Sequence, residues 1–545
     1  MLTISVCTSI VMLLFCTAFS QVSAASKVGT FNNTGAANKA KWSSKANSYV
    51  VLLDFGKPVN TDIIANGVQW SAYPHADTKD AEWGLLMTPH KWSRVFERLD
   101  YIKPGIIRVM DQAGWRYFKG VDASGNPILD FNTDEVKALF NVLDYCQKNN
   151  IVVIFGEWGA PGFWGEPGMI DRSDDTRWIS MITRYLDYLI NKKGYSCIKY
   201  YNLVNEPNGN WASTNGDWDQ WKKGLLMLND SIASIGLKGK LQIAGPDAVV
   251  VYDNPTSPYK GFEWIDESIK QLDHIIGAYD VHAYPDGESV RSGEFGKYYG
   301  DIYNKVKPTG KKLLLGELGL KYSGDLFLKN RELALADPNA SKDDSNMFVY
   351  EYFYGLDVAD AVIQAMNNCL EGAIAWDLDD AMHTQDDKGD KTKLKRWGMW
   401  NSLGTELCHN PKDENLRPWF YTWSLMCRYF PSGMSIARTS VDSGSPLKVV
   451  AGVLIPDKNP GNSKVFRKAI SVALLNNSDE CINISLKSAG ISMTGRFYKY
   501  LYIDGKRAVD VKGFPVAADN IKIKTSDFNL SVPAKSFILL TNLKK

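Results

Sequence analysis

The stretch YYNLVNEPNGNW, from Tyr200 to Trp211, joins a run of strand-forming residues to a polar loop. The run stops at Asn205 and Glu206, and Pro207 cannot continue a strand ladder because it lacks a backbone N–H. A carboxyl group is costly to bury without a partner, so its place at the end of an apolar strand calls for an explanation. The usual explanation is a functional role. In that case the rest of the chain must supply a second reactive group.

Short apolar or β-branched runs alternate with helical periodicity between about residues 67 and 430. Residues 132–148, for example, place apolar side chains at the i, i+3, i+4 and i+7 spacing of one helix face. The runs predicted to be strands are 67–73, 105–110, 151–158, 198–206, 241–247, 276–284, 312–318 and 372–378. Strands separated by helices form right-handed crossovers and a parallel sheet. We therefore predict an α/β fold, a closed (β/α)8 TIM barrel over residues 67–430, enlarged by polar insertions at 323–344 and 379–415.

The pattern changes after residue 431. Short apolar runs follow one another, with turn residues between them and no helical periodicity, at 449–455, 469–475, 481–486, 497–503, 521–523 and 537–542. Short strands at such spacing predict a C-terminal antiparallel β-sandwich domain over residues 431–545. The N-terminal segment 26–66 contains one more predicted strand, at 49–54, which is a candidate to join that sandwich.

Composition limits the kinds of partner. The chain has 545 residues, more than one hydrophobic core normally serves, and its 62 basic and 61 acidic residues nearly cancel. A neutral chain is not expected to bind nucleic acid or an anionic membrane, both of which favour a basic surface. Residues 10–19 are apolar and are followed by small residues at 21–25, which predicts a cleaved signal peptide over residues 1–25 and an exported protein, extracellular or periplasmic.

The active site of such a barrel lies at the C-terminal ends of its strands, so polar residues at those ends are the candidates. Glu206 ends the fourth predicted strand and Glu317, in KLLLGELG, ends the seventh. These strands lie on opposite sides of the barrel mouth. Cleavage of a glycosidic bond requires one carboxyl group that donates a proton and a second that stays ionised and attacks the sugar. The two environments must therefore push the two pKa values apart.

Polar side chains on other strand ends fit around this pair. Arg108, on the second strand, is expected to keep Glu317 ionised, and Tyr284 is expected to donate a second hydrogen bond to it. His282 and Tyr284 alternate with apolar residues along the sixth strand, so both are expected to face inward. Asn205 suits the 2-hydroxyl of a sugar.

Aromatic and acidic residues complete the set of candidates. Trp376, on the eighth strand, is predicted to form the floor under the sugar, and Trp158 is either a sugar platform or a packing residue. Glu157 is either a sugar ligand or the partner of a neighbouring arginine. The acidic residues that follow the eighth strand, including Asp377 and Asp379, are predicted to form a solvated loop. The cysteines are scattered without C-x-x-C spacing, so we expect no metal site.

The NEP of the fourth strand, the GELG of the seventh, the arginine of the second, the HAY of the sixth and the tryptophan of the eighth resemble clan A of the retaining glycoside hydrolases. Cellulase-like family 5 and β-xylosidase-like family 39 are the most similar families, and a barrel followed by a β-sandwich is also similar to families 30 and 39. This resemblance implies that Glu206 is the acid/base and Glu317 the nucleophile. It also implies a covalent glycosyl-enzyme and net retention.

We therefore expect an exported retaining β-glycoside hydrolase that acts on β-linked oligo- or polysaccharides without a metal or organic cofactor. A transglycosylase with the same covalent intermediate is one alternative. A non-catalytic carbohydrate-binding barrel protein is another, although the presence of both glutamates argues against it. The sequence does not select the sugar, or endo over exo action.

Overall fold

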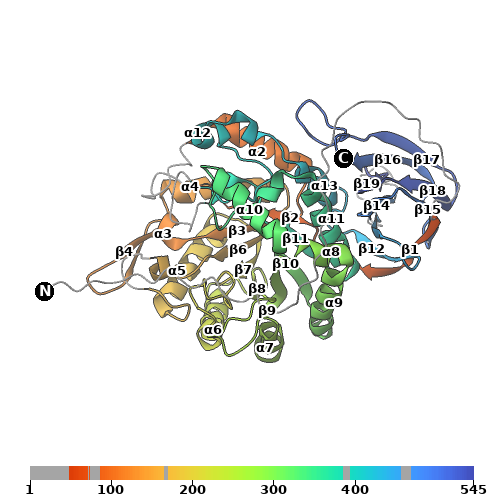
Figure 1. Cartoon of the computed structure of the whole chain (residues 1–545). Helices are drawn as coiled ribbons and strands as arrows, with labels where there is room; N and C mark the ends of the chain where they lie inside the picture. Colours follow the sequence, from red (N-terminus) through yellow and green to blue (C-terminus); the bar gives the residue numbers. More distant parts are fainter. Residues whose placement is uncertain are drawn as a thin grey trace, which may run out of the picture. The chain divides into compact units, whose positions relative to one another are not determined.

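The computed structural model describes residues 48–71, 73, 86–164, 170–383, 393–455 and 468–544 (Figure 1). The predicted signal peptide, residues 1–25, lies outside this set. Among the described residues, no helix combines the length and the apolar character needed to cross a membrane.

Parallel strands close into a barrel in the order β10-β11-β2-β3-β6-β7-β8-β9 (Figure 1). The strands are β2 (Gly67–Gln69), β3 (Ile106–Asp111), β6 (Val152–Glu157), β7 (Ile198–Asn202), β8 (Gln242–Val249), β9 (Ile276–Ala283), β10 (Lys312–Leu318) and β11 (Gly372–Ala375). Each overlaps one of the predicted strands, so the TIM barrel is confirmed. β7 ends before Asn205 and Glu206, which instead lie in a turn where Glu206 has a φ of 49°.

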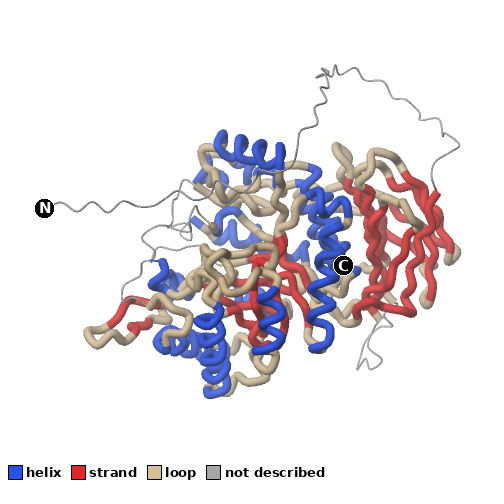
Figure 2. The backbone as a smooth tube through the Cα atoms, turned by 60° about the horizontal axis from the view of Figure 1, so that its bottom comes forward, coloured by secondary structure: helices blue, strands red, loops and turns tan. Residues whose placement is uncertain are grey.

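Helices surround the barrel strands, as Figure 2 shows. α2 (Pro89–Ile102) begins where the Thr88 side chain accepts a hydrogen bond from the backbone N–H of Lys91, which supplies a partner for an otherwise orphaned donor. The remaining α-helices are α3 (Ala113–Arg116), α4 (Asp134–Lys148), α5 (Thr176–Leu186), α6 (Trp218–Ser234), α7 (Glu263–Leu272), α8 (Gly287–Ser292), α9 (Glu294–Val306), α10 (Gly324–Ala336), α11 (Tyr352–Asn367), α12 (Gly404–Cys408) and α13 (Pro418–Arg428). The two polar insertions thus hold α10 and α12. A hairpin that the sequence did not indicate, β4 (Phe118–Val121) and β5 (Pro127–Leu129), follows α3.

The barrel interior changes from apolar to charged along the strands. One buried apolar cluster takes a side chain from each of seven barrel strands, namely Ile106, Ile154, Tyr200, Ala244, Ala278, Leu314 and Ile374, together with Ile64. Because side chains alternate between the two faces of a strand, the residues two positions further on also face inward. On β3 and β9 these are Arg108 and Asp280, both fully buried. The apolar layer therefore supports a charged layer nearer the mouth.

The C-terminal domain is one sheet of the order β17-β16-β19-β14-β13-β12-β1-β15-β18. Its strands are β1 (Ser48–Asn60), β12 (Ser435–Val441), β13 (Leu447–Leu454), β14 (Ala469–Asn476), β15 (Ile482–Ala489), β16 (Gly495–Tyr502), β17 (Asp519–Ile523), β18 (Asp527–Val532) and β19 (Ser536–Thr541). Val532 near one end of this order and Phe497 near the other share one core, which is the arrangement of a sandwich. The predicted β-sandwich is confirmed, and β1 pairs with β12 antiparallel and with β15 in parallel.

The burial of β14 explains why the sequence of this domain contains continuous apolar runs. All of its residues are buried. Leu474 faces the core of the sandwich, whereas Ala473 and Leu475 belong to the large core that also contains the barrel helices. A strand that is covered on both faces shows no polar alternation.

Gly67 on β2 offers a test of barrel closure. A Cβ at this position would lie 1.5 Å from the backbone carbonyl oxygen of Ile106. We expect Gly67→Ala to push β2 away from β3 and to lower the thermal unfolding midpoint strongly, because backbone cannot move aside as a side chain can. Gly56→Ala on β1 is the matched control. There the nearest atom is 3.2 Å away at the end of the Asp54 side chain, so a small effect is expected. Equal midpoints for the two variants would contradict this account of β2.

Candidate active site

Glu206 and Glu317 meet at the mouth of the barrel. A carboxylate oxygen of each and a ring nitrogen of His282 all lie within 4.8 Å of one another. His282 stands between the two carboxyl groups, with Nδ1 2.8 Å from Glu206 Oε1 and 3.4 Å from Glu317 Oε2. Glu317 and His282 are buried and lie on the neighbouring strands β10 and β9, where they form a register pair. The structure thus brings together the two glutamates that the sequence singled out.

Both oxygens of Glu317 receive a hydrogen bond from a predicted partner. Arg108 Nη1 donates to Oε1 at 2.5 Å, and the Tyr284 hydroxyl donates to Oε2. Arg108 Nη2 donates to Asn205 Oδ1 at 2.8 Å and to Asp247 Oδ2 at 2.9 Å. One guanidinium therefore holds groups from three elements, and a planar fork of donors suits this role.

Asp247 is a member of the site that the sequence reasoning missed. It lies on β8 and accepts from Arg108, and its Oδ1 is 2.9 Å from His282 Nε2. Both ring nitrogens of His282 are thus engaged by carboxylates, which fixes the ring between β8 and the two glutamates. A signal was present, because Asp247 ends the predicted strand 241–247 in the same way that Glu317 ends the seventh.

The electrostatics of the pair differ from the expectation. Burial alone would raise the pKa of Glu206, but the hydrogen bond and charge of His282, with the charge of Lys321 and the hydrogen bond from Trp211, together lower it below its ordinary value. Burial and the charge of Glu206 raise the pKa of Glu317, in spite of His282 and Arg108. Arg108 lowers the pKa of Glu317, in the direction expected, but Arg108 and His282 do not outweigh burial and the charge of Glu206. His282, whose own pKa the surrounding carboxylates raise against the effect of burial, stands closer to Glu206.

Asp280 adds a neutral acid beneath this layer. Burial, together with the charge of Asp247, raises its pKa from 3.8 to about 8 against the charges of His282 and Arg108. A protonated Asp280 donates to Asp247 and so helps to keep that carboxylate ionised. Gly316 makes room for it, since a Cβ there would lie 2.4 Å from Asp280 Oδ1.

Glu206, His282 and Glu317 are also close enough to share a cation. Their surroundings argue against that use. Arg108 already places a positive charge 2.5 Å from Glu317, and both nitrogens of His282 are bound to carboxylates. These two features suit a site that handles protons rather than a metal ion.

Aromatic side chains line one side of the mouth. Trp376 stacks on His383 at 4.9 Å and 26°, and Trp158 meets both rings edge-on, at 6.0 Å from Trp376. Trp376 is 8% exposed. The two predicted aromatic candidates therefore lie in one group, together with a histidine that the sequence reasoning did not select.

Glu157 does not join the site. It is fully buried and accepts hydrogen bonds from the Ala113 backbone N–H at 3.0 Å and the Tyr117 hydroxyl at 2.9 Å. Ile154 on the same strand points into the barrel, so Glu157, three positions further on, points to the opposite face. The interpretations of Glu157 as a sugar ligand or as an arginine partner are both wrong. The nearby Arg116 pairs instead with other acids.

The acidic residues after the eighth strand are not solvated. Asp377, Asp379 and Asp380 are fully buried. Asp379 accepts from the Tyr73 hydroxyl and from Trp400 Nε1, each at 2.8 Å, and Asp380 binds Arg396 and Arg417. The predicted solvated loop is therefore wrong for these residues. They fix the chain beyond β11 against the barrel.

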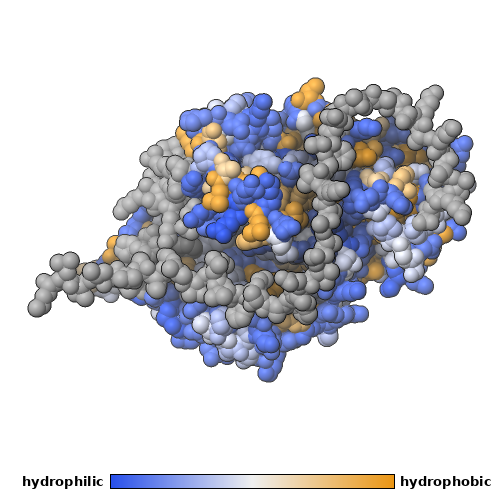
Figure 3. Space-filling view, in the orientation of Figure 1, coloured by the Kyte–Doolittle hydropathy of each residue, from blue (hydrophilic) through white to orange (hydrophobic). Residues whose placement is uncertain are grey.

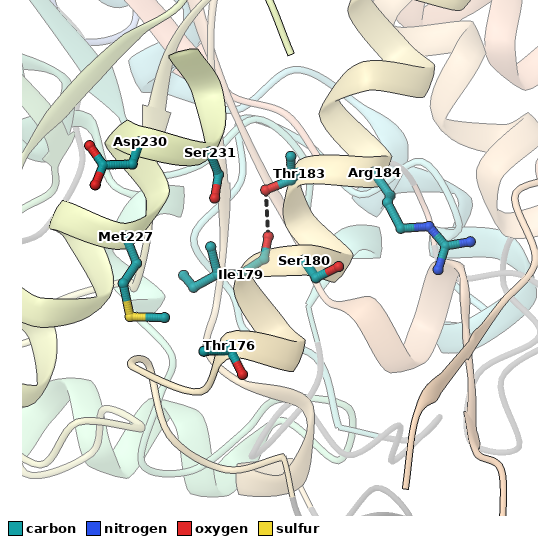
Figure 4. Close-up of a pocket in the computed structure, with 8 residues that line it drawn as sticks. All are labelled: Thr176, Ile179, Ser180, Thr183, Arg184, Met227, Asp230 and Ser231. Atoms are coloured by element: carbon teal, nitrogen blue, oxygen red, sulfur yellow. Dashed lines mark hydrogen bonds between the residues drawn. The ribbon is translucent and has the colours of Figure 1, made fainter. Parts of the chain in front are cut away.

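A surface groove of about 380 Å³ lies away from these residues (Figure 4). It runs between α5 and α6 and is lined by Thr176, Ile179, Ser180, Thr183, Arg184, Met227, Asp230 and Ser231. None of the residues described above contributes to it. The groove therefore has no place in the chemistry of the barrel mouth.

Arg108 allows a stability test of the charged layer. We expect Arg108→Met to lower the free energy of unfolding by about 3–5 kcal/mol, because Glu317 and Asp247 lose the cation that compensates their burial. The control is Arg177→Met. Arg177 pairs with Asp175 at 2.6 Å but is 36% exposed, so the expected loss is about 1 kcal/mol or less. Urea unfolding curves of both variants measure the difference, and similar losses would contradict the role given to Arg108.

Asp280→Asn tests the neutral acid. Between its ordinary pKa of 3.8 and the folded value of about 8, the folded chain binds a proton that the unfolded chain has lost. The stability contributed by this group therefore falls as pH rises through that window. The asparagine cannot ionise, so the stability of the variant relative to the native chain should improve from about pH 4 to about pH 8 and then stay constant. A difference that is independent of pH in urea unfolding would refute the assignment.

No protein-family model matches the sequence. One curated relative is the exo-beta-1,6-galactobiohydrolase of Bifidobacterium longum subsp. longum, 26% identical over 242 residues. The alignment covers 42% of this chain and 14% of that protein, so the chain spans only a small part of the relative's length.

Two solved structures share the architecture. The catalytic domain of the family 30 xylanase C from Talaromyces cellulolyticus is 14% identical, with a TM-score of 0.55 over 91% of this chain and 100% of that chain. The alpha-L-arabinofuranosidase from Thermotoga maritima is 13% identical, with a TM-score of 0.56 over 91% and 99%. At these identities the likeness concerns the fold. In its fold, a barrel with a C-terminal β-sandwich, the chain resembles the glycoside hydrolases of clan A.

Proposed function

We propose that this protein is a retaining β-glycoside hydrolase in which Glu317 is the nucleophile and Glu206 the acid/base. The observation that carries the proposal is the separation of the two carboxyl groups, whose nearest oxygens lie within 4.8 Å. Retaining enzymes hold their carboxyl groups about 5–5.5 Å apart, whereas inverting enzymes need about 6.5–9.5 Å to admit a water molecule.

The reaction runs in two displacements. A carboxylate oxygen of Glu317 attacks the anomeric carbon while the bond to the leaving oxygen breaks, and Glu206 gives its proton to that oxygen. The product is a glycosyl ester on Glu317. Glu206, now ionised, then takes a proton from water as the water oxygen bonds to the anomeric carbon, and the ester bond breaks to regenerate the Glu317 carboxylate.

The surroundings of Glu317 favour its role. Arg108 and Tyr284 donate to both of its oxygens, so they orient the carboxylate and stabilise the charge that returns when the ester breaks. In the free protein the pKa of Glu206 is lowered, chiefly by His282, and burial raises that of Glu317. The first displacement requires the proton on Glu206 and the charge on Glu317.

The substrate class follows from the walls of the site. Trp158 and Trp376 directly follow β6 and β11, at the end of the barrel where the two glutamates lie, and the Asn205 amide, held by Arg108, suits a sugar hydroxyl. The similar proteins, named as a galactobiohydrolase, a xylanase and an arabinofuranosidase, support a glycan substrate. A β-linked oligo- or polysaccharide is proposed. The apolar run at 10–19 and the small residues after it support export. A transglycosylase would use the same residues and differ in the acceptor.

The stereochemical course tests the mechanism. The native protein is screened against 4-nitrophenyl β-glycosides of galactose, glucose, xylose and mannose, and the hydrolysed glycoside is followed by proton NMR. The proposal predicts that the first product is the β-anomer, which then mutarotates. The α-anomer as the first product would overturn the double displacement. If the protein hydrolyses neither these glycosides nor β-linked polysaccharides, the proposed activity is refuted.

Rescue by azide separates the two roles. We expect Glu206→Ala and Glu317→Ala each to lose at least about 10³-fold in kcat on the 4-nitrophenyl glycoside, because each removes a step of the reaction. Added azide should give the β-glycosyl azide with Glu206→Ala, where Glu317 still forms the intermediate. With Glu317→Ala it should give the α-glycosyl azide by direct attack. Glu332→Ala on α10, 70% exposed, is the control and should keep native activity. If Glu206→Ala gave the α-glycosyl azide and Glu317→Ala the β-glycosyl azide, the two roles would have to be reversed.

A further inference from the structure

We propose that Trp211 is a positioning residue that holds Glu206 in its resting, ionised form until a sugar on the leaving-group side displaces the indole. This inference rests on the proposed function and goes beyond it, because it assigns the step that makes Glu206 an acid. It also assigns Trp211 to the part of the site that recognises the departing sugar.

Both oxygens of Glu206 are already engaged by N–H groups or ring nitrogens. Oε1 lies 2.8 Å from His282 Nδ1, and Oε2 accepts a hydrogen bond from Trp211 Nε1 at 2.6 Å. An indole nitrogen can only donate, so this bond stabilises the carboxylate and opposes its protonation. A glycosidic oxygen needs one Glu206 oxygen as a proton donor. Each oxygen keeps a second lone pair, so these bonds do not block protonation; they stabilise the charged form, and the loss of either one makes Glu206 easier to protonate.

The difference in exposure between Trp211 and His282 indicates which of the two leaves Glu206 more easily. His282 is fully buried and its other nitrogen is bound to Asp247. Trp211 is 42% exposed and lies in the loop that follows β7. The indole leans back over Gly209, where a Cβ would lie 2.5 Å from the ring, so this glycine permits the capping position. Moving Trp211 breaks one exposed hydrogen bond and its packing on Tyr252, whereas moving His282 would break the charged layer.

The displacing ligand is identified by the same surroundings. The indole packs on Tyr252 with ring centroids 4.5 Å apart, and the neighbouring Val251 is 63% exposed. These residues form an open, partly apolar margin directly beside Glu206. A pyranose ring offers C–H faces to such a surface and hydroxyls to the indole N–H. The leaving sugar therefore has both the contact and the competing acceptors that release the carboxylate.

Displacement of the indole makes Glu206 an acid. When the indole leaves, Glu206 loses a donor that lowers its pKa, while His282 and Lys321 continue to act on it. Glu206 then takes up a proton from solvent, which the open position of Trp211 admits, and holds it for the leaving oxygen. Arg108 and Tyr284 remain on Glu317, which attacks as the carboxylate.

The test compares two pH profiles of Trp211→Phe, which keeps an aromatic face and removes the N–H. The substrate is a β-linked disaccharide of the sugar hydrolysed in the 4-nitrophenyl panel, because its poor leaving group makes glycosylation the slow step. The basic limb of kcat/KM reports loss of the catalytic proton from the glutamate pair of the free enzyme and should move to higher pH, since a donor that stabilises the Glu206 carboxylate is lost. The basic limb of kcat reports bound enzyme, in which the indole has already left, and should stay in place.

Tyr49→Phe is the control, since Tyr49 lies on β1 in the β-sandwich and the change removes one polar group from a partly buried ring away from the mouth. Both of its limbs should coincide with those of the native enzyme. If Trp211→Phe moves both limbs equally, the indole stays bound in the complex and the displacement is refuted. If it changes KM alone, Trp211 is only a contact surface. An α-anomer as the first product, or native activity in the Glu206→Ala or Glu317→Ala variant, would instead refute the proposed function. The two failures are therefore distinguishable.

Discussion

The buried guanidinium of Arg108 is the constraint on which the barrel mouth depends. None of its side chain is exposed, and a buried charge is tolerated only with charged and hydrogen-bonding partners. Glu317 and Asp247 supply the charges and Asn205 an amide oxygen. These partners come from β10, β8 and the turn after β7. Satisfying one cation therefore fixes three sides of the mouth and places the Glu317 carboxylate where a sugar can reach it.

The charged layer also explains how four acids can share so small a volume. Arg108 and a protonated His282 balance Asp247 and one of the two glutamates, and Asp280 remains neutral because burial raises its pKa to about 8. A pair that shares one proton is what a double displacement requires, since one carboxyl group must be acid when the other is base.

The barrel could be predicted from sequence because its strands are covered on both faces, so each is an apolar run bounded by turn residues. The pairing of Glu206 with Glu317 followed from the rule that strand ends meet at one face. β12 and β18 were not predicted because their exposed sides interrupt the apolar pattern. Glu157 was placed wrongly because strand-end position alone does not reveal which face a side chain takes. The order of the pKa values could not be predicted at all, since it depends on whether His282 lies 2.8 or 3.4 Å from a carboxylate.

The proposed double displacement requires a covalent bond between the sugar and Glu317. Incubation with an activated 2-deoxy-2-fluoro β-glycoside of the preferred sugar slows both steps, while the good leaving group keeps the first one fast enough for the intermediate to accumulate. Mass spectrometry of the intact protein and of its proteolytic peptides then locates the adduct. The account predicts one fluoroglycosyl group on Glu317. An adduct on Glu206 or any other residue, or turnover of the compound with inversion and without an adduct, would contradict it.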